Sequence, residues 1–299
     1  MQIQTFSIVA GTAACNARCP FCISKMTPLM GIDELLTKDL PINEHKFRTA
    51  CRLAWRAGCV TAMFTGKGEP TIYPKQITRY LQLMEANLGI YNFPIIEMQT
   101  NGILLHDRPE IYTDHLKQWL DLGMTTLAVS IVHYDPAMNR LIYLPYKDEY
   151  IDLPKLIEFL HKLGFSVRLT CIGIKDFIDG PEKLKQLMAF AKANGVEQLT
   201  FTPATKPRAE DARNPIWVWT NENHLMHHQI EAIVRYVESN GSHLWTLSHG
   251  AKVYDVGGQN LCLNECLTVQ PEKPELRNLI FFPDGKLMPY WQFEGARLL

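Results

Sequence analysis

Three cysteines stand in one short run of the chain: Cys15, Cys19 and Cys22, spaced C-x3-C-x2-C. Three thiolates at this spacing, in a loop after a short apolar strand, can hold three corners of an iron–sulfur cube and leave the fourth iron without a protein ligand. A cluster that only transfers electrons usually has four cysteine ligands, and a structural zinc needs a fourth ligand close by. Neither pattern is obvious here. The run therefore predicts an open iron site for chemistry, with zinc as the alternative.

The same run places an aromatic residue, Phe21, just before the last cysteine. This pattern resembles the signature of the radical S-adenosylmethionine (radical SAM) superfamily. The resemblance implies a 4Fe-4S cluster on Cys15, Cys19 and Cys22, whose open iron chelates the amino and carboxylate groups of S-adenosyl-L-methionine (SAM). An electron from the cluster then cleaves the sulfonium and yields a 5'-deoxyadenosyl radical. The backbone of Phe21 would lie near the adenine.

A second motif, T-G-K-G-E-P-T, occupies residues 65–71. The glycines Gly66 and Gly68 let the backbone come close to a ligand, and the Glu69 carboxylate with nearby carbonyls can grip an ammonium group. The motif resembles the G-G-E-P motif of radical SAM proteins, which holds the amino group of SAM, with Lys67 replacing the usual second glycine. A solvated Gly-rich turn is the alternative for this motif taken alone. Two such motifs in succession favour the SAM site.

Polar residues at the ends of later strands give weaker signals of the same kind. Thr100 and Asn101, in a T-N-G triplet, are similar to residues that line the SAM site in the family, although an Asn-Gly turn explains them equally well. Ser130 takes a position where the family often has a polar residue that meets the ribose or carboxylate. By the same resemblance, Arg168 and Thr202 would reach the SAM carboxylate and the adenine.

The substrate side is less visible, because a deoxyadenosyl radical abstracts hydrogen from whichever C–H bond the fold holds against it. The candidates there are His133, Tyr134 and Asp135 after the fourth predicted strand, Cys171 near the end of the fifth, and Lys206 and Arg208 after the sixth. A buried structural cysteine is the alternative interpretation of Cys171, and a polar loop is the alternative for residues 133–135.

The elements that must position these residues follow from periodicity. Apolar runs of strand length alternate with amphipathic stretches, which is typical of βα units and a parallel sheet. The runs predict strands over residues 5–10, 61–65, 95–100, 126–132, 166–172 and 198–202. The amphipathic stretches predict helices over residues 44–57, 74–87, 109–121, 153–163, 181–193 and 222–239.

Six βα units fit the fold that the resemblance implies: α/β, a partial (βα)6 TIM-like barrel with a small C-terminal α+β appendage. Ligands of parallel α/β sheets bind at the carboxyl ends of the strands, which is where both motifs fall. We expect a radical SAM core barrel over residues 1–205 and a helix and β-hairpin extension over residues 206–299 that caps the barrel.

The extension raises the question of a second cluster. The core of this chain resembles the branch of the superfamily that contains the cyclase of molybdenum-cofactor biosynthesis. That cyclase and the peptide-modifying maturases carry auxiliary clusters in such extensions. Here Cys262 and Cys266 precede a predicted hairpin over residues 279–290 with a Pro-Asp-Gly turn. The hairpin of those extensions ends in Pro-Cys, whereas this chain has Tyr290. Two thiols do not fill a cluster, so we expect one cluster rather than two.

Composition narrows the partners. The 299 residues include 30 basic and 31 acidic side chains, for a net charge of −1, which gives no footprint for nucleic acid or an anionic membrane. The chain shows no signal-peptide pattern and no segment near the ~18 apolar residues of a membrane span. The crowding of cysteines at residues 15–22 indicates metal in a reducing compartment. We therefore expect a cytoplasmic protein.

The expected function is biosynthetic modification of a small metabolite, a nucleotide or a short peptide. The resemblance also implies an electron donor such as flavodoxin or ferredoxin. One alternative is a zinc- or cluster-stabilised binding protein without turnover. The other is a peptide- or tRNA-modifying radical SAM enzyme with an auxiliary cluster in the extension.

Overall fold

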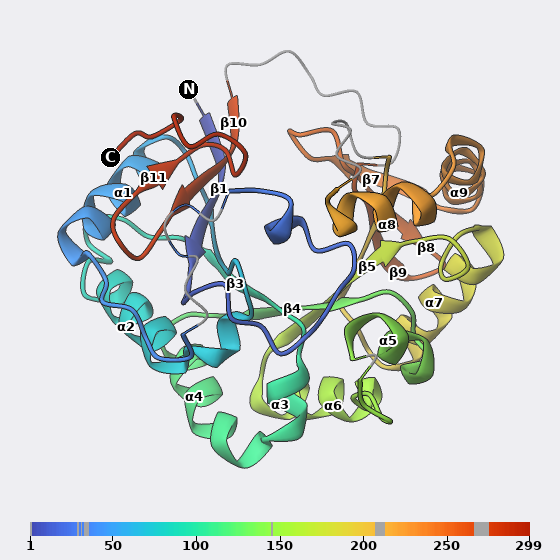
Figure 1. The fold of residues 1–299 in the computed structure, drawn as a ribbon, viewed down its shortest axis with the longest axis horizontal. Helices are drawn as coiled ribbons and strands as arrows, with labels where there is room; N and C mark the ends of the chain where they lie inside the picture. Colours follow the sequence, from blue (N-terminus) through green and yellow to red (C-terminus); the bar gives the residue numbers. More distant parts are fainter. Residues whose placement is uncertain are drawn as a thin grey trace.

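The sheet of this protein forms an open, barrel-like curve with helices around it (Figure 1). The computed structural model describes residues 2–28, 30, 32, 36–144, 146–206, 213–265 and 275–299. These residues form one eleven-stranded sheet in the order β11-β10-β1-β2-β3-β4-β5-β6-β9-β8-β7. The strands are β1 Gln2–Val9, β2 Thr61–Thr65, β3 Ile95–Thr100, β4 Thr126–Ile131, β5 Ser166–Gly173, β6 Gln198–Pro203, β7 Ser242–Thr246, β8 Lys252–Val256, β9 Gln259–Leu263, β10 Glu275–Phe281 and β11 Leu287–Met288.

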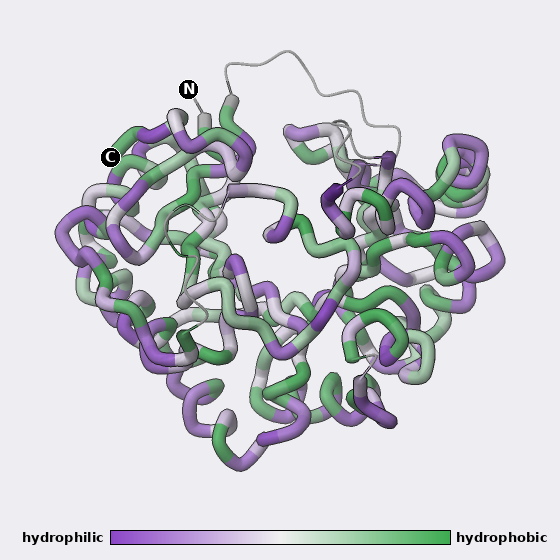
Figure 2. Tube along the Cα trace, in the orientation of Figure 1, coloured by the Kyte–Doolittle hydropathy of each residue, from purple (hydrophilic) through white to green (hydrophobic). Residues whose placement is uncertain are grey.

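Helices follow most of the first six strands and cover the outer face of the sheet (Figure 1). They are α1 Glu44–Arg56, α2 Pro74–Glu85, α3 Ile103–Asp107, α4 Pro109–Asp121, α5 Pro136–Tyr143, α6 Leu153–Leu163, α7 Pro181–Ala193, α8 Pro215–Asn223 and α9 His227–Asn240, with short 3-10 turns at Ile23–Lys25 and Pro70–Ile72. Along these helices hydrophilic and hydrophobic residues alternate (Figure 2), so each helix can bury one stripe against the sheet.

Strands β1 to β6 pair in parallel in the order of the chain. A parallel pair needs a crossover connection, which the helices between the strands supply. The α/β partial barrel expected from the sequence is therefore confirmed, and each of the six predicted strands is present with its ends shifted by at most a few residues.

The helices begin where local sequence allows it. Prolines occupy the first turn of α2, α4, α5, α6, α7 and α8, where the missing N–H costs no hydrogen bond. Side-chain oxygens also satisfy free N–H groups of first turns. At α1 Asn43 accepts from the N–H of Lys46 at 3.1 Å, and at α6 Asp152 accepts from the N–H of Lys155 at 3.1 Å.

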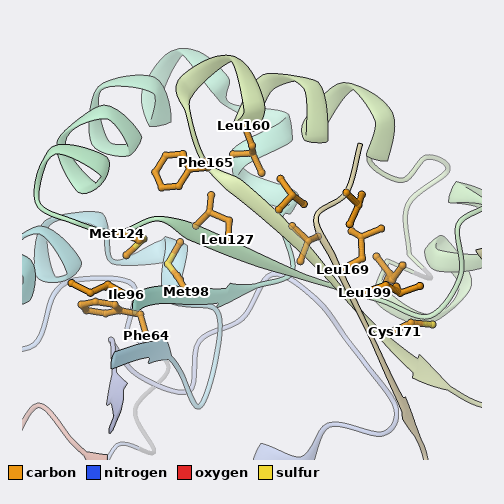
Figure 3. Packing of buried hydrophobic residues seen from close by; sticks show 14 of the residues in the cluster. Phe64, Ile96, Met98, Met124, Leu127, Leu160, Phe165, Leu169, Cys171 and Leu199 are labelled. Carbon is orange, nitrogen blue, oxygen red and sulfur yellow. The ribbon is translucent and has the colours of Figure 1, made fainter. Parts of the chain in front are cut away.

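Alternation along β5 divides the protein into two environments. Val167, Leu169 and Cys171 are fully buried against the helices, whereas Arg168 and Thr170 line a cavity on the inner face. Figure 3 shows the outer layer, in which side chains of the strands meet those of the surrounding helices. The main hydrophobic core therefore lies outside the barrel, and the inner face is free to be polar.

One predicted helix differs from the structure. The stretch 222–239 contains the end of α8 and most of α9, and the two helices are separated near Leu225. The N–H of Leu225 donates to the carbonyl of Ala204 at 2.9 Å, and its side chain is buried. This long-range hydrogen bond and the burial interrupt a stretch whose apolar period is helical.

The C-terminal strands extend the sheet at both edges. Strand β9 pairs in parallel with β6, and β10 pairs in parallel with β1. The predicted hairpin is confirmed as β10 and β11, closed by a hydrogen bond from the N–H of Phe282 to the carbonyl of Lys286 at 2.9 Å. The division of the chain at residue 205 stays a prediction, since strands on both sides of it belong to one sheet.

Candidate active site

The cysteine run forms a loop after β1. The N–H of Cys22 donates to the carbonyl of Cys19 at 3.4 Å, and the N–H of Ala17 points to the Sγ of Cys15 at 3.4 Å. The pKa of Cys15 is raised to about 11, mainly by burial and then by the charges of Glu69 and Cys22. The pKa of Cys19 is raised to about 12, mainly by burial and then by the charges of Cys22 and Cys15. The three thiols are therefore close enough to repel one another when ionised, and they need a cation to become thiolates together.

An iron–sulfur cube fits this donor set. Its iron atoms would supply the missing positive charge, and the cube spreads its protein ligands over several metal atoms. Within the described ranges, no three His, Cys, Asp or Glu side chains converge on a point where they could hold one metal ion. Cys15, Cys19 and Cys22 are thus the residues that would hold a cluster.

The cysteine loop is fixed to the segment around α5. The N–H of Arg18 donates to the carbonyl of Tyr143 at 3.0 Å, and the hydroxyl of Tyr146 donates to the carbonyl of Asn16 at 2.6 Å. The guanidinium of Arg18 also lies 4.5 Å from the centre of the Tyr146 ring. These contacts hold the loop against α5 and the segment that follows it.

The ring of Phe21 lies among aromatic side chains. It meets Tyr143 edge-on at 6.4 Å between ring centres and Trp219 of α8 at 5.9 Å. The position of its backbone near an adenine stays a prediction. The ring contacts hold in place the short segment between Cys19 and Cys22.

The motif at residues 65–71 packs directly on the cysteine loop. The N–H of Glu69 donates to the carbonyl of Ala14 at 3.0 Å. A Cβ atom at Gly68 would lie 1.9 Å from that same carbonyl oxygen, so only glycine fits there. The close approach of the two loops is the physical reason for this glycine.

The carboxylate of Glu69 joins two of the predicted motifs. Its Oε1 accepts from the Thr71 N–H at 3.1 Å, the Thr71 hydroxyl at 2.7 Å and the Thr100 hydroxyl at 2.6 Å, and its Oε2 accepts from the Asn101 N–H at 2.9 Å. Burial raises its pKa, whereas these hydrogen bonds lower it. In the described part of the chain no cationic side chain is paired with it.

Asn101 also reaches the cysteine loop. Its Nδ2 donates to the Oδ1 of Asn16 at 2.7 Å and lies 4.0 Å from the Sγ of Cys15. The loops after β1, β2 and β3 therefore meet at one place, although their residues lie far apart in the sequence.

The side chain of Lys67 engages a different set of partners. Its Nζ donates to the hydroxyl of Thr27 at 2.5 Å and lies 5.2 Å from the centre of the Trp291 ring. Burial lowers the pKa of Lys67 to about 8, and the negative charge of Cys22 opposes that shift. Lys67 and Glu69 are thus neighbours in sequence with separate surroundings.

A cavity of about 890 Å³ lies inside the curve of the sheet. Its wall includes Thr65, Gln99, Thr170 and Thr202 from the strands, together with Thr27 from the turn after the cysteines. The Thr202 hydroxyl accepts a hydrogen bond from Asn264 at 3.1 Å. Many residues of this wall carry hydroxyl or amide groups, which gives a polar ligand hydrogen-bond partners beside apolar surface.

Arg168 lies in the cavity wall, but it is already paired. Its guanidinium contacts the Glu97 carboxylate at 2.7 Å, and the two side chains are 19% and 8% exposed. Ser130 is partly buried on the same face of β4 as Thr126, which lines the cavity. Neither position contradicts a role toward SAM, and both roles stay predictions.

The structure places three substrate-side candidates away from the wall of this cavity, and their roles stay predictions. Cys171 is fully buried on the outer face of β5, near Leu169 (Figure 3), because the strand's alternation turns it away from the cavity. Tyr134 donates its hydroxyl to Gln186 of α7 at 2.9 Å, on the helix side. His133 accepts from the N–H of Asp135 at 2.9 Å and does not line the cavity.

The two further substrate-side candidates were Lys206 and Arg208. Lys206 is exposed. Arg208 lies outside the described residues, as does Cys266. Cys262, by contrast, lines the cavity. Burial raises its pKa to about 11, although Arg168 and Arg277 lower it.

Several cavity residues were not predicted from the sequence. Glu97, His249, Arg277 and Trp291 all line the wall, and three of them belong to the C-terminal part of the chain. The only sequence signal near them was the hairpin that ends at Tyr290, because it predicted a folded C-terminal segment without indicating where it packs.

The family model of the radical SAM superfamily matches residues 9–191, which span both motifs and strands β2 to β5. This chain belongs to the radical SAM superfamily. It is therefore an enzyme of the radical SAM class, and the family implies a 4Fe-4S cluster and SAM as its cofactors.

Curated relatives agree with a cyclase-like core. This radical SAM enzyme is 26% identical over 203 residues to a GTP 3',8-cyclase of Tolumonas auensis, which covers 68% of this chain and 54% of the relative. It is 24% identical over 196 residues to a GTP 3',8-cyclase of Rhizobium leguminosarum bv. trifolii, with 64% and 50% covered. The chain spans about half the length of these relatives.

Solved structures support the fold of the radical SAM enzyme. The structure of anSMEcpe with bound AdoMet superposes with a TM-score of 0.61 at 13% identity and covers 100% of this chain and 74% of that chain. SuiB of Streptococcus suis bound to precursor peptide SuiA gives a TM-score of 0.58 at 13% identity, with 97% and 60% covered. Within the described ranges, no helix is both long and apolar enough to cross a membrane.

Proposed function

We propose that this radical SAM enzyme holds one 4Fe-4S cluster through Cys15, Cys19 and Cys22 and cleaves SAM reductively beside it. The observation that carries the proposal is the direct contact between the cysteine loop and the Glu69 loop, whose backbones share a hydrogen bond of 3.0 Å at Ala14. When bound, the cluster supplies the electron that breaks the sulfonium bond of SAM.

Glu69 would orient SAM through its charge. The carboxylate is buried and accepts four hydrogen bonds, which hold it in one position, but it has no cationic partner in the described part of the chain. A buried carboxylate is stabilised strongly by a nearby ammonium group. The amino group of SAM would supply that charge, while Thr100 and Asn101 keep the carboxylate aimed at it.

The cavity supports a proposal for the substrate class. A volume of about 890 Å³ lies within the usual range of small-molecule sites, roughly 300–1,000 Å³, and part of it must admit the reacting end of SAM. The remaining space and the polar wall favour a nucleotide or a metabolite of similar size. The curated relatives named GTP 3',8-cyclase support a nucleotide. The product would be a modified metabolite in a biosynthetic step.

Anaerobic reconstitution with iron and sulfide tests the proposal. We expect a brown protein with ~4 iron atoms per chain that forms 5'-deoxyadenosine from SAM when dithionite is added. Cys19→Ala should lose both iron and product. Cys51→Ala, which removes a thiol on the buried face of α1, is the matched control and should retain both. A colourless protein that keeps one zinc and forms no 5'-deoxyadenosine would refute the proposal.

The number of clusters is tested in the same samples. A second cluster would double the iron to ~8 atoms per chain, and Cys262→Ala would then lower the count. We expect Cys262→Ala to keep the wild-type iron content. We further propose that flavodoxin or ferredoxin supplies the electron in the cell, so either protein with its reductase should replace dithionite.

A further inference from the structure

Lys67 is a buried ammonium group with an unusual set of neighbours. The residue is 4% exposed. Its Nζ has one hydrogen-bond partner, the hydroxyl of Thr27, and one aromatic neighbour, the ring of Trp291. In the described ranges no carboxylate is paired with it. Burial of a charge without a counter-charge has a large free-energy cost, so a negative group near Lys67 would stabilise it.

The other strong charges of the cavity wall are paired within the protein. Arg168 contacts Glu97 at 2.7 Å, and Arg277 contacts Glu265 at 2.8 Å. Lys67 differs from both arginines. Burial lowers the pKa of Lys67, and the charge that opposes this shift comes from Cys22, the last cysteine of the run.

The hydrogen bond to Thr27 connects Lys67 to the turn that carries this cysteine. The hydroxyl of Thr27 donates to the carbonyl of Ile23 at 3.1 Å, and the N–H of Lys25 donates to the carbonyl of Cys22 at 3.0 Å. The ammonium group is therefore hydrogen-bonded to the short turn segment that begins at Cys22, the last cysteine of the run. Trp291 covers it from the C-terminal side.

Lys67 is also poorly suited to hold the amino group of SAM. Two ammonium groups repel each other, and the carboxylate of Glu69 faces a separate set of donors at Thr71 and Thr100. We therefore expect the lysine that replaces a glycine in the motif to have a role other than binding the amino group of SAM.

We infer that the Lys67 ammonium group is the counter-charge of the cluster held by Cys15, Cys19 and Cys22, and that it raises the reduction potential of that cluster. This inference rests on the proposed function. Reduction adds one electron to a group that already carries thiolate charges, so a fixed positive charge in a poorly solvated site stabilises the reduced state more than the oxidised state. Lys67 is in this sense a positioning residue for charge and takes no part in bond breaking.

Redox titration monitored by electron paramagnetic resonance tests the inference on the reconstituted protein without substrate. At the wild-type midpoint potential, the ratio of reduced to oxidised cluster should fall by about 10-fold in Lys67→Met, which corresponds to about 59 mV for one electron. Lys67→Arg keeps the charge and should stay much closer to the wild type. Lys117→Met, which removes an exposed lysine of α4, is the control and should not shift the potential.

A second variant separates charge from tethering. Thr27→Val removes the hydrogen bond but keeps the ammonium group, so it should shift the potential less than Lys67→Met does. A Lys67→Met protein with full iron content and the wild-type potential would overturn the inference. A Lys67→Met protein with that potential but weaker SAM binding would overturn it too, and would assign the lysine to the SAM carboxylate.

The failure of the proposed function has a different appearance. If the wild type takes up no iron or forms no 5'-deoxyadenosine, the cluster itself is wrong. If the wild type does both and Lys67→Met has the wild-type reduction potential, only the counter-charge inference fails.

Discussion

Gly68 offers the most direct test of how the two loops of the site depend on each other. In Gly68→Ala, the new Cβ would lie 1.9 Å from the carbonyl oxygen of Ala14, 2.5 Å from its carbonyl carbon and 2.8 Å from the carbonyl carbon of Ala13. All three atoms belong to the backbone, so no side chain can rotate away. To bring the shortest contact to 3.0 Å, below which real Cβ atoms are essentially never found, the loops must separate by about 1 Å.

That separation acts on the hydrogen bond from the Glu69 N–H to the same Ala14 oxygen, now 3.0 Å long. Overpacking of this kind costs about 1–3 kcal/mol, and at roughly 2 °C or more per kcal/mol the melting temperature should fall by roughly 2–8 °C. Because Ala14 precedes Cys15, the displaced loop should also hold less iron after reconstitution.

Thermal unfolding of the metal-free protein, followed by circular dichroism, measures the first effect, and iron analysis measures the second. Gly89→Ala is the matched control, because a Cβ there meets nothing within 4 Å. It should leave both the melting temperature and the iron content unchanged. A Gly68→Ala protein that melts at the wild-type temperature and takes up full iron would refute the reasoning.

Three other predictions follow from charges and caps. Glu69→Gln should weaken SAM binding about 10-fold or more, because the charge is lost and an amide N–H would face the N–H of Asn101; equilibrium dialysis measures it, the iron content should not change, and an unchanged affinity contradicts the assignment. Arg168→Met leaves the Glu97 carboxylate without its partner, and Glu97→Gln leaves the Arg168 guanidinium without its partner. Each single variant should lower the free energy of unfolding by about 3 kcal/mol. The double variant should recover most of this in urea unfolding, whereas additive losses would contradict the pairing. Asp152→Ala removes a helix cap and should cost about 1 kcal/mol at neutral pH. Because hydrogen bonds from Lys155 hold the pKa of Asp152 below its usual value, the stabilisation is present above the unfolded pKa of about 3.9 and is lost as the pH falls through the lower folded pKa. The difference between wild type and Asp152→Ala should therefore shrink in acid, and a constant difference would show that the charge plays no part.

Much of the fold could be read from the sequence because its signals are local. Apolar runs and amphipathic stretches marked the six parallel strands and the helices between them. The break at Leu225 could not be read in this way. It arises from a hydrogen bond to Ala204 and from burial in the tertiary structure, and both outweigh a helical period of the same residues.

One cysteine considered for the substrate side and one considered for a second cluster illustrate the same limit. Cys171 and Cys262 both lie on strands, and neither sequence context tells which face each occupies. The register of β5 turns Cys171 to the helices, and the pairing of β9 with β6 turns Cys262 to the cavity. A shift of one residue in either register would exchange their environments.

The chemistry of this protein is already written in its sequence: in the spacing of Cys15, Cys19 and Cys22, in the second motif at the end of the next strand, and in the alternation of strands and helices that places both at one edge of a sheet. These features are local, since spacing and period are written in neighbouring residues. Only the tertiary structure decided that Glu69 meets Asn101 and that Lys67 lies between Thr27 and Trp291. Such contacts depend on strand register and on the packing of segments far apart in the chain, so the charges around the cysteines became visible only in the folded protein.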